Sequence, residues 1–177
     1  LSGQGLKFSW LHHPNFGGDL LSECTTLELP EGTEVEVDKY LNGESSILEP
    51  GYRGLFPMVK SKSGGMVDLS RFPRDINTND LVYVPNVKGN WFKLINEDLG
   101  IIIEANWDPS VFRSMWLWRP LGGGFNYPWF SRIYATSIEL STSWPATGLA
   151  EQVKAGTAYE IQGNGELNTW IRFKVTS

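Results

Sequence analysis

Alternation of hydrophobic and polar residues is the main pattern along the chain. The stretch 33–41, "TEVEVDKYL", places Val35 and Val37 between acidic residues, and "TWIRFKV" at 169–175 alternates in the same way. This period of two is typical of a strand with one buried face. Further segments rich in β-branched or aromatic residues are 80–85, 90–96, 99–107, 114–120 and 133–140. Each of them predicts a strand.

Turn signals separate these segments, among them "NGES", "NVKGN", "PLGGG" and "QGNGE". No segment keeps a 3.6-residue hydrophobic period, and 148–156 could form a short helical turn at most. The pattern therefore predicts an all-β fold, an antiparallel β-sandwich, with residues 1–177 as a single domain. A sandwich of this kind often presents one concave sheet, which can carry an aromatic-lined groove.

The charge balance narrows the choice of partners. The 177 residues contain 15 Lys and Arg against 20 Asp and Glu, a formal net charge of −5, and the basic residues do not cluster. A nucleic-acid or anionic-membrane partner is disfavoured by this balance. The sequence also contains no apolar run long enough to span a bilayer.

Cys24 is the only cysteine of the sequence, so no disulfide can form within the chain. Its surroundings, "LLSECTTLEL", resemble a strand, and we expect a buried, inert thiol, with a reactive nucleophile as the minor alternative. The compartment stays open, with a reducing, cytoplasmic one slightly favoured. Residue 1 is Leu and leads directly into structured-looking sequence, so we also expect an upstream part of the same domain.

Several reaction classes lack their motifs. His12 and His13 are the only histidines, and adjacent residues of a strand point to opposite faces, which argues against a shared metal ion. No Gly-x-Ser-x-Gly elbow occurs, and the glycines of "GGGFNYP" do not open a helix. We therefore predict neither a metal site nor a phosphate-cradling loop.

Aromatic residues gather in "SMWLWRPLGGGFNYPWFSRIY", at 114–134. Alternation places Trp116 and Trp118 on one face of a strand, and Trp129 follows in a Gly- and Pro-rich loop. Flat rings beside polar groups suit the C–H faces of sugars. The alternative is that these rings fill the core between two sheets.

Two carboxylates are candidates for a reactive group. Glu139 ends an apolar strand before a Ser/Thr-rich turn, where partial desolvation would raise its pKa and suit it to act as a base. The alternative is a strand residue that faces solvent. Asp80 begins a strand, a position that is also typical of turn and cap residues.

Together these segments resemble the galactose mutarotase-like family, the aldose 1-epimerases and their relatives. The resemblance rests on "WLHHPNFGG", on "CTTLELPEGTEVEVDKY" and on the segment from Tyr127 to Val175, which contains "ATSIELSTSWP". It covers nearly the whole chain, but only the later, C-terminal portion of the family's domain. It implies an antiparallel supersandwich and a sugar as the small-molecule partner.

The resemblance also implies roles for individual residues. Glu139 matches the family's base and His13 its acid, while His12 and Asp80 match positions that contact sugar hydroxyls; Trp116, Trp118 and Trp129 would form the groove walls. Mutarotation needs a base for the anomeric hydroxyl and an acid for the ring oxygen, and a carboxylate and an imidazole can supply both. The resemblance implies no cofactor.

Two departures from the family pattern keep alternatives open. An Arg and a further His of the family's upstream part have no counterpart in this sequence, so the chain by itself could be inactive and could need a missing N-terminal part. His12 stands where the best-known branch has Asn, and it could be the acid instead of His13. The chain could also be a non-catalytic carbohydrate-binding β-sandwich, or an interaction domain with its tryptophans in the core.

Overall fold

The computed structural model describes residues 3–177. Its larger sheet has the strand order β2-β13-β12-β9-β5-β6, and β3 also pairs with β13. The bounds are β2 Leu11–His12, β3 Asn15–Gly17, β5 Glu34–Val37, β6 Arg53–Leu55, β9 Thr78–Val84, β12 Ser114–Leu121 and β13 Ala135–Ser141. All pairings within this sheet are antiparallel.

The smaller sheet has the order β15-β11-β10-β4 and is also antiparallel. Its strands are β4 Thr25–Glu28, β10 Trp91–Asn96, β11 Ile101–Trp107 and β15 Ile171–Thr176. Two short ribbons pair β1 (Leu6–Phe8) with β14 (Tyr159–Ile161), and β7 (Met58–Lys60) with β8 (Met66–Asp68). The predicted antiparallel β-sandwich is confirmed.

The hydrophobic core lies between the two large sheets. Alternate residues of the central strands point into it, for example Val82, Leu117 and Ile138 from the larger sheet. Phe92 of the smaller sheet meets Phe16 of β3 with ring centroids 6.1 Å apart. Successive residues of a strand alternate between faces. The residues next to Val82, Leu117 and Ile138 along their strands therefore lie on the outer face of the larger sheet.

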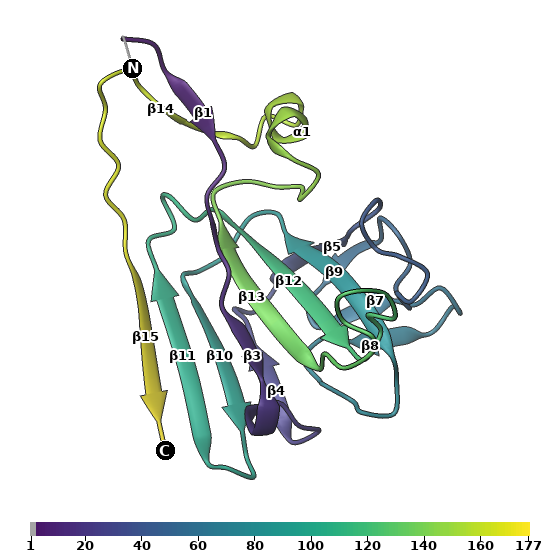
Figure 1. Ribbon diagram of the computed structural model, residues 1–177. Coiled ribbons are helices and arrows are strands. Elements are labelled where there is room, and N and C mark those ends of the chain that lie inside the picture. Colours follow the sequence, from purple (N-terminus) through teal and green to yellow (C-terminus); the bar gives the residue numbers. More distant parts are fainter. Residues whose placement is uncertain (1–2) are drawn as a thin grey trace.

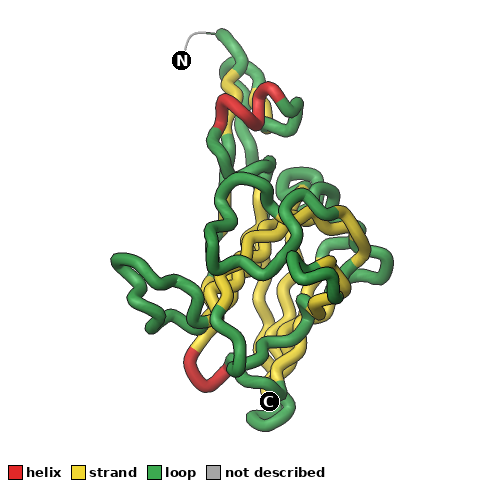
Figure 2. The backbone as a smooth tube through the Cα atoms, turned by 90° about the vertical axis from the view of Figure 1, so that its right-hand side faces the viewer, coloured by secondary structure: helices red, strands yellow, loops and turns green. Residues whose placement is uncertain are grey.

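The helical parts are small and lie outside the core. The 3-10 helix η1 spans Gly18–Leu20 and α1 spans Leu149–Lys154, within the short helical turn expected at 148–156. Figures 1 and 2 show that α1 and the β1–β14 ribbon project together beyond one end of the sandwich, while the C-terminus lies at the other end. The candidate site described below is therefore formed by the large sheets and their loops.

Two details differ from the sequence-based expectation. The strand expected at 33–41 ends at Val37, because the carboxylate of Asp38 accepts the backbone N–H groups of Tyr40, Leu41 and Asn42 and closes a turn. The expectation of a buried Cys24 on a strand is wrong. Cys24 is exposed in the turn that precedes β4, where neighbouring acidic residues, Asp98 first, raise its thiol pKa.

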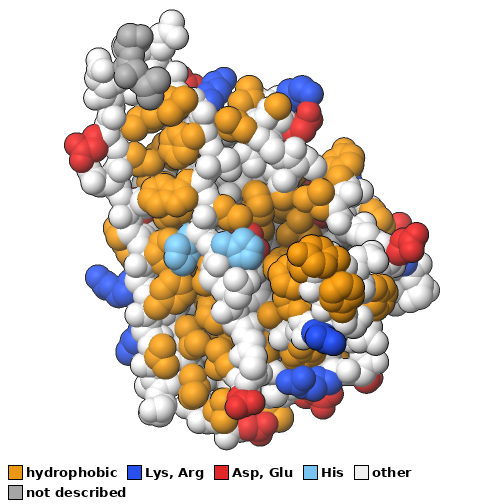
Figure 3. Space-filling view, viewed as in Figure 1, with side chains coloured by type: hydrophobic (Ala, Val, Ile, Leu, Met, Phe, Trp, Pro, Cys, Tyr) orange, Lys and Arg blue, Asp and Glu red, His pale blue; other side chains and the backbone are white. Residues whose placement is uncertain are grey.

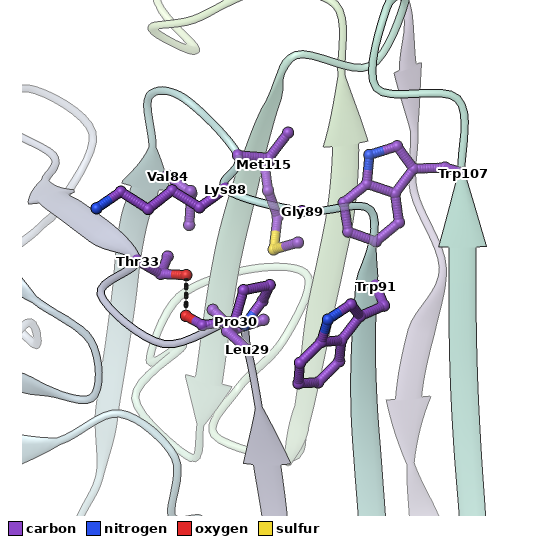
Figure 4. Close-up of a pocket in the computed structure, with 10 residues that line it drawn as sticks. Leu29, Pro30, Thr33, Val84, Lys88, Gly89, Trp91, Trp107 and Met115 are labelled. Carbon is purple, nitrogen blue, oxygen red and sulfur yellow. Dashed lines mark hydrogen bonds between the residues drawn. The ribbon is translucent and has the colours of Figure 1, made fainter.

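A small apolar hollow lies at one end of the sandwich, between Pro30, Val84, Trp91, Trp107 and Met115 (Figure 4). Its volume is ≈ 10 Å³, about the space that one water molecule needs. It is an imperfection of core packing, too small to hold a ligand.

Candidate functional site

The candidate site lies on the outer face of the larger sheet. Cross-strand pairing aligns Glu139 of β13 with Trp116 of β12, and Trp116 with Tyr83 of β9. The next row joins Ser137, Trp118 and Leu81 in the same way. Residues paired directly across antiparallel strands point to the same face, so both rows project away from the core.

His13 and Glu139 meet at the edge of this face. His13 directly follows β2, the edge strand, and its Nε2 atom lies 3.1 Å from Oε1 of Glu139. The Glu139 side chain is only 4% exposed, whereas that of His13 is 42% exposed. The imidazole therefore forms the accessible side of the pair, and the carboxylate forms its floor.

Burial changes the acidity of the carboxylate. Desolvation raises the pKa of Glu139 to about 7, and a smaller, opposing effect comes from the Ser137 hydroxyl. A carboxyl group with this pKa exchanges its proton near neutral pH, which is the condition for efficient general acid or base catalysis.

Ser137 fixes the other side of the imidazole. Its hydroxyl lies 2.9 Å from Nδ1 of His13 and donates toward the Pro14 carbonyl and Oδ1 of Asn15, both at 2.8 Å. Because the hydroxyl has one proton and these two oxygens only accept, its oxygen is left as the acceptor for His13. With Nδ1 as the donor to this oxygen, Nε2 is the ring nitrogen that faces the Glu139 carboxyl at 3.1 Å.

A groove of ≈ 320 Å³ opens above the pair. Its lining consists of Leu11, His13, Leu41, Asn42, Asn79, Leu81, Trp116, Trp118, Glu139 and Ala146. Figure 3 shows the two histidine side chains next to each other on the surface, with hydrophobic side chains around them; only His13 lines the groove. Aromatic walls with a few polar groups at the floor are typical of small-molecule sites.

Both tryptophan walls are anchored through their ring nitrogens. Trp118 donates its indole N–H to Oδ1 of Asn79 at 2.7 Å, and Trp116 donates to the Ser143 carbonyl at 3.0 Å. Trp118 also meets the ring of His13 edge-on, with centroids 6.0 Å apart. The indoles are half-buried and are not part of the central core.

Tyr83 and Asp38 connect the two loops that close the groove. The Tyr83 hydroxyl donates to Oδ2 of Asp38 at 2.6 Å and accepts the backbone N–H of Ala146 at 3.1 Å. Burial, followed by the bond to Asp38, raises the pKa of Tyr83. Since the Asp38 turn carries Leu41 and Asn42 to the groove, this buried pair sets the position of both rims.

The other sequence-predicted residues lie in different places. Trp129 stands beside the groove, with its ring centroid 5.9 Å from that of Trp118. His12 pairs with Leu140, on the face opposite to Glu139, and its ring lies 5.8 Å from that of Phe173. Burial, and then the nearby His13, lower the pKa of His12.

Asp80 is fully buried on the inner side of the larger sheet. Its carboxylate accepts hydrogen bonds from Ser46 at 2.7 Å and Thr78 at 2.8 Å, and lies 3.9 Å from Nη1 of the fully buried Arg119. The structure thus brings Glu139, His13, Trp116 and Trp118 together, with Trp129 adjacent, and does not bring His12 or Asp80 to the groove.

Some groove residues escaped the sequence analysis. Ser137 could have been found, because it stands two positions before Glu139 and shares its face. Asn79 and Leu81 share the face of Tyr83 in the same way. Asn42 and Ala146 belong to loops, and no periodicity in the sequence marks their position.

Residues 3–177 were also searched for a metal site and for a membrane-spanning helix. Within them, no three side chains of the His, Cys, Asp and Glu types gather closely enough to hold a metal ion. No helix formed by these residues combines the length and the hydrophobicity needed to cross a membrane.

The chain was compared with known proteins. No family model matches it, and no curated protein gives a significant match. Among solved structures, it is similar to a "putative aldose 1-epimerase" from Klebsiella pneumoniae subsp. pneumoniae, with a TM-score of 0.67 and 13% identity over 98% of this chain and 40% of that one. The Slr1438 protein from Synechocystis sp. PCC 6803 is also similar, with a TM-score of 0.60 and 13% identity over 98% and 46% of the two chains.

These likenesses concern the fold. The chain has the β-sandwich fold of the Klebsiella protein, and it spans less than half the length of either solved structure. The resemblance to mutarotase-like proteins is thereby supported at the level of architecture.

Proposed function

We propose that the groove binds a sugar and that the chain is an aldose 1-epimerase-like protein, with Glu139 and His13 as its acid/base pair. The observation that carries this proposal is the contact of 3.1 Å between His13 Nε2 and the buried Glu139 carboxyl, on the floor of an aromatic-walled groove. The fold shared with the Klebsiella protein supports the same activity.

The contact between an imidazole and a carboxyl group supports an acid/base role for this pair. In the charge-separated form, Glu139 is a carboxylate and His13 an imidazolium. Glu139 would take the proton of the anomeric hydroxyl while His13 gives its Nε2 proton to the ring oxygen, so that the C1–O5 bond breaks and an open-chain aldehyde forms. Ring closure on the other face of the aldehyde returns both protons. The protons balance over the cycle, and this sequence of steps consumes no co-reactant.

The substrate must enter between the two side chains. In the structure the side chains of His13 and Glu139 contact each other directly, so a sugar ring can lie between them only if one of them moves. His13 is the more exposed partner and follows an edge strand of two residues, so we expect its Nε2 atom to move away from Glu139 when a sugar binds, while Nδ1 stays on Ser137. Trp116 and Trp118 would then stack on the C–H face of that sugar.

A second candidate is carbohydrate binding without catalysis. The direct contact of His13 with Glu139 favours it, because a satisfied pair could simply stabilise the groove. Under this alternative the tryptophans would bind sugar and the pair would be structural. The two candidates agree on the ligand and differ on whether anomers interconvert.

Polarimetry separates the candidates. A fresh solution of an aldose changes its optical rotation slowly, and we expect the chain to accelerate this change for at least one member of an aldose panel. Glu139→Gln should reduce the catalysed rate at least about a hundredfold, while sugar binding, followed by tryptophan fluorescence, persists. Glu104→Gln is the control, since Glu104 lies on β11 of the other sheet and pairs with Lys93. Binding without acceleration by the unaltered chain would leave the non-catalytic candidate.

A further inference from the structure

The loop that joins β12 to β13 exposes a group of aromatic side chains. Within residues 122–132, Phe125 is 55% exposed, Tyr127 82%, Trp129 41% and Phe130 56%. Contiguous apolar surface of this kind is rare on soluble proteins unless it binds something. The proposed acid/base reaction leaves these four rings without a role.

The loop backbone is held in place by its own hydrogen bonds. Ser131 N–H donates to the Gly124 carbonyl at 2.7 Å, and the Trp129 N–H donates to the Asn126 carbonyl at 2.9 Å. Gly123 packs so closely on β9 that a Cβ atom there would lie 2.2 Å from the backbone of Thr78. The rings are therefore presented by an ordered base, and binding would cost little additional ordering.

The exposed rings continue the wall of the groove. Ring centroids are 6.0 Å apart from His13 to Trp118, and 5.9 Å apart from Trp118 to Trp129, where the planes meet at 58°. Aromatic faces thus lead step by step from the acid/base pair to the loop. A ligand anchored at Glu139 and extending past Trp118 would reach Trp129 next.

We propose that Trp129 and its loop form a second sugar subsite, so that the ligand is a reducing oligosaccharide of two or more units. This inference rests on the proposed function. The reducing-end ring would lie against Trp118 with its anomeric carbon at the His13–Glu139 pair, and the following ring would stack on Trp129. The angle between the two indoles suits two sugar rings that are not coplanar.

The composition of the loop favours a sugar over a charged partner. Arg132 is the only charged residue in "GGGFNYPWFSR", and the neighbouring groups are an amide, a hydroxyl and a phenol. Rings beside neutral hydrogen-bonding groups match a surface of C–H faces and hydroxyls.

Binding constants test the subsite without depending on catalysis. Dissociation constants would be measured by calorimetry for lactose, maltose and cellobiose, whose reducing-end ring is glucose in each case, and for glucose as their single-ring counterpart. We expect at least one disaccharide to bind the unaltered chain about tenfold more tightly than its monosaccharide, and Trp129→Ala to bring the two within about twofold. Trp170→Ala is the matched control, because Trp170 is 47% exposed but lies next to β15 of the other sheet, and it should leave the preference unchanged.

The outcomes distinguish this inference from the proposed function. Equal binding of mono- and disaccharides, or a disaccharide preference that survives Trp129→Ala, would overturn the subsite even if the chain accelerates mutarotation. A preference that depends on Trp129, in a chain that accelerates no mutarotation, would keep the subsite and reject catalysis. Concentration-dependent self-association that Trp129→Ala abolishes, with no effect on sugar binding, would identify the loop as a protein contact and would also overturn the proposal.

Discussion

Nε2 of His13 lies 3.1 Å from Oε1 of Glu139, although the two residues are far apart in the sequence. The antiparallel pairing of β2 and β3 with β13 brings them together, since Leu11 opposes Ser141 and Asn15 opposes Ser137. The turn between β2 and β3 therefore projects His13 directly over the floor carboxylate. The contact follows from strand register, and a register shift of one residue would turn Glu139 to the opposite face.

The catalysed rate should depend on pH through Glu139. The base must be ionised, and burial raises the pKa of this carboxyl to about 7. We therefore expect the acidic limb of the rate profile to have its half-maximum near pH 7, and the rate to fall again at higher pH, where His13 has lost the proton that it must give to the ring oxygen. Polarimetric rates in a series of buffers at constant ionic strength check this. A rate that is already maximal at pH 5 would show that the base is an unperturbed carboxylate.

The same burial should appear in the stability of the fold. In the folded chain the pKa of Glu139 is about 7, above the ordinary value of 4.5. The stability that the protonated carboxyl group contributes is therefore fully present below pH 4.5 and is lost as the pH rises through 7. Glu139→Gln removes this dependence. Between pH 4 and pH 8 the unaltered chain should lose about 3 kcal/mol of unfolding free energy relative to the variant. Urea titrations at the two pH values measure this loss. A difference in unfolding free energy between the unaltered chain and Glu139→Gln that is the same at pH 4 and at pH 8 would contradict the burial effect.

Ser137 should act as a positioning residue for His13. Its oxygen accepts the Nδ1 hydrogen, and Ser137→Ala would release the ring and weaken the control of its tautomer. We expect the maximal rate to fall about tenfold or more with little change in KM, and Ser137→Thr to restore much of it because the hydroxyl is kept. An equal loss in both variants would mean that the effect comes from packing.

Asp80 should matter for stability. Its carboxylate is fully buried beside Arg119 and holds Ser46 and Thr78. Asp80→Ala would leave a buried guanidinium without its counter-charge, which costs about 3 kcal/mol. Chemical denaturation measures this cost, and the sugar affinity of the protein that remains folded should be unchanged. A loss of sugar affinity at full stability would instead place Asp80 in the site.

The sequence was informative wherever a strand alternates. It predicted β12 and β13 within two residues of their ends, and the alternation alone places Trp116 with Trp118 on one face. It could not show that Glu36 and Asp38, polar positions of an apparently half-buried strand, are themselves buried. Glu36 is covered by Arg53 at 2.7 Å, and Asp38 accepts the Tyr83 hydroxyl. These contacts join segments that are distant in the sequence, and the local alternation of hydrophobic and polar residues cannot predict them.

The histidine pair illustrates the same limit. Alternation correctly separates His12 and His13 onto different faces, but it does not tell which face becomes the groove. That depends on the partner strand, because Leu140 opposite His12 points inward and Glu139 points outward. Asp80 is limited in the same way. Its strand was expected, but the inward direction of its carboxylate depends on the pairing of β9 with β12.

A double-mutant cycle on mutarotation tests the central claim most directly. The rate of approach to anomeric equilibrium would be followed by polarimetry for the unaltered chain, His13→Gln, Glu139→Gln and the double variant. Two side chains that exchange protons with one sugar in the same step act as a unit, so we expect the double variant to be about as slow as either single one. Rate losses that multiply, or single variants that retain the full rate, would show that the pair does not carry the reaction.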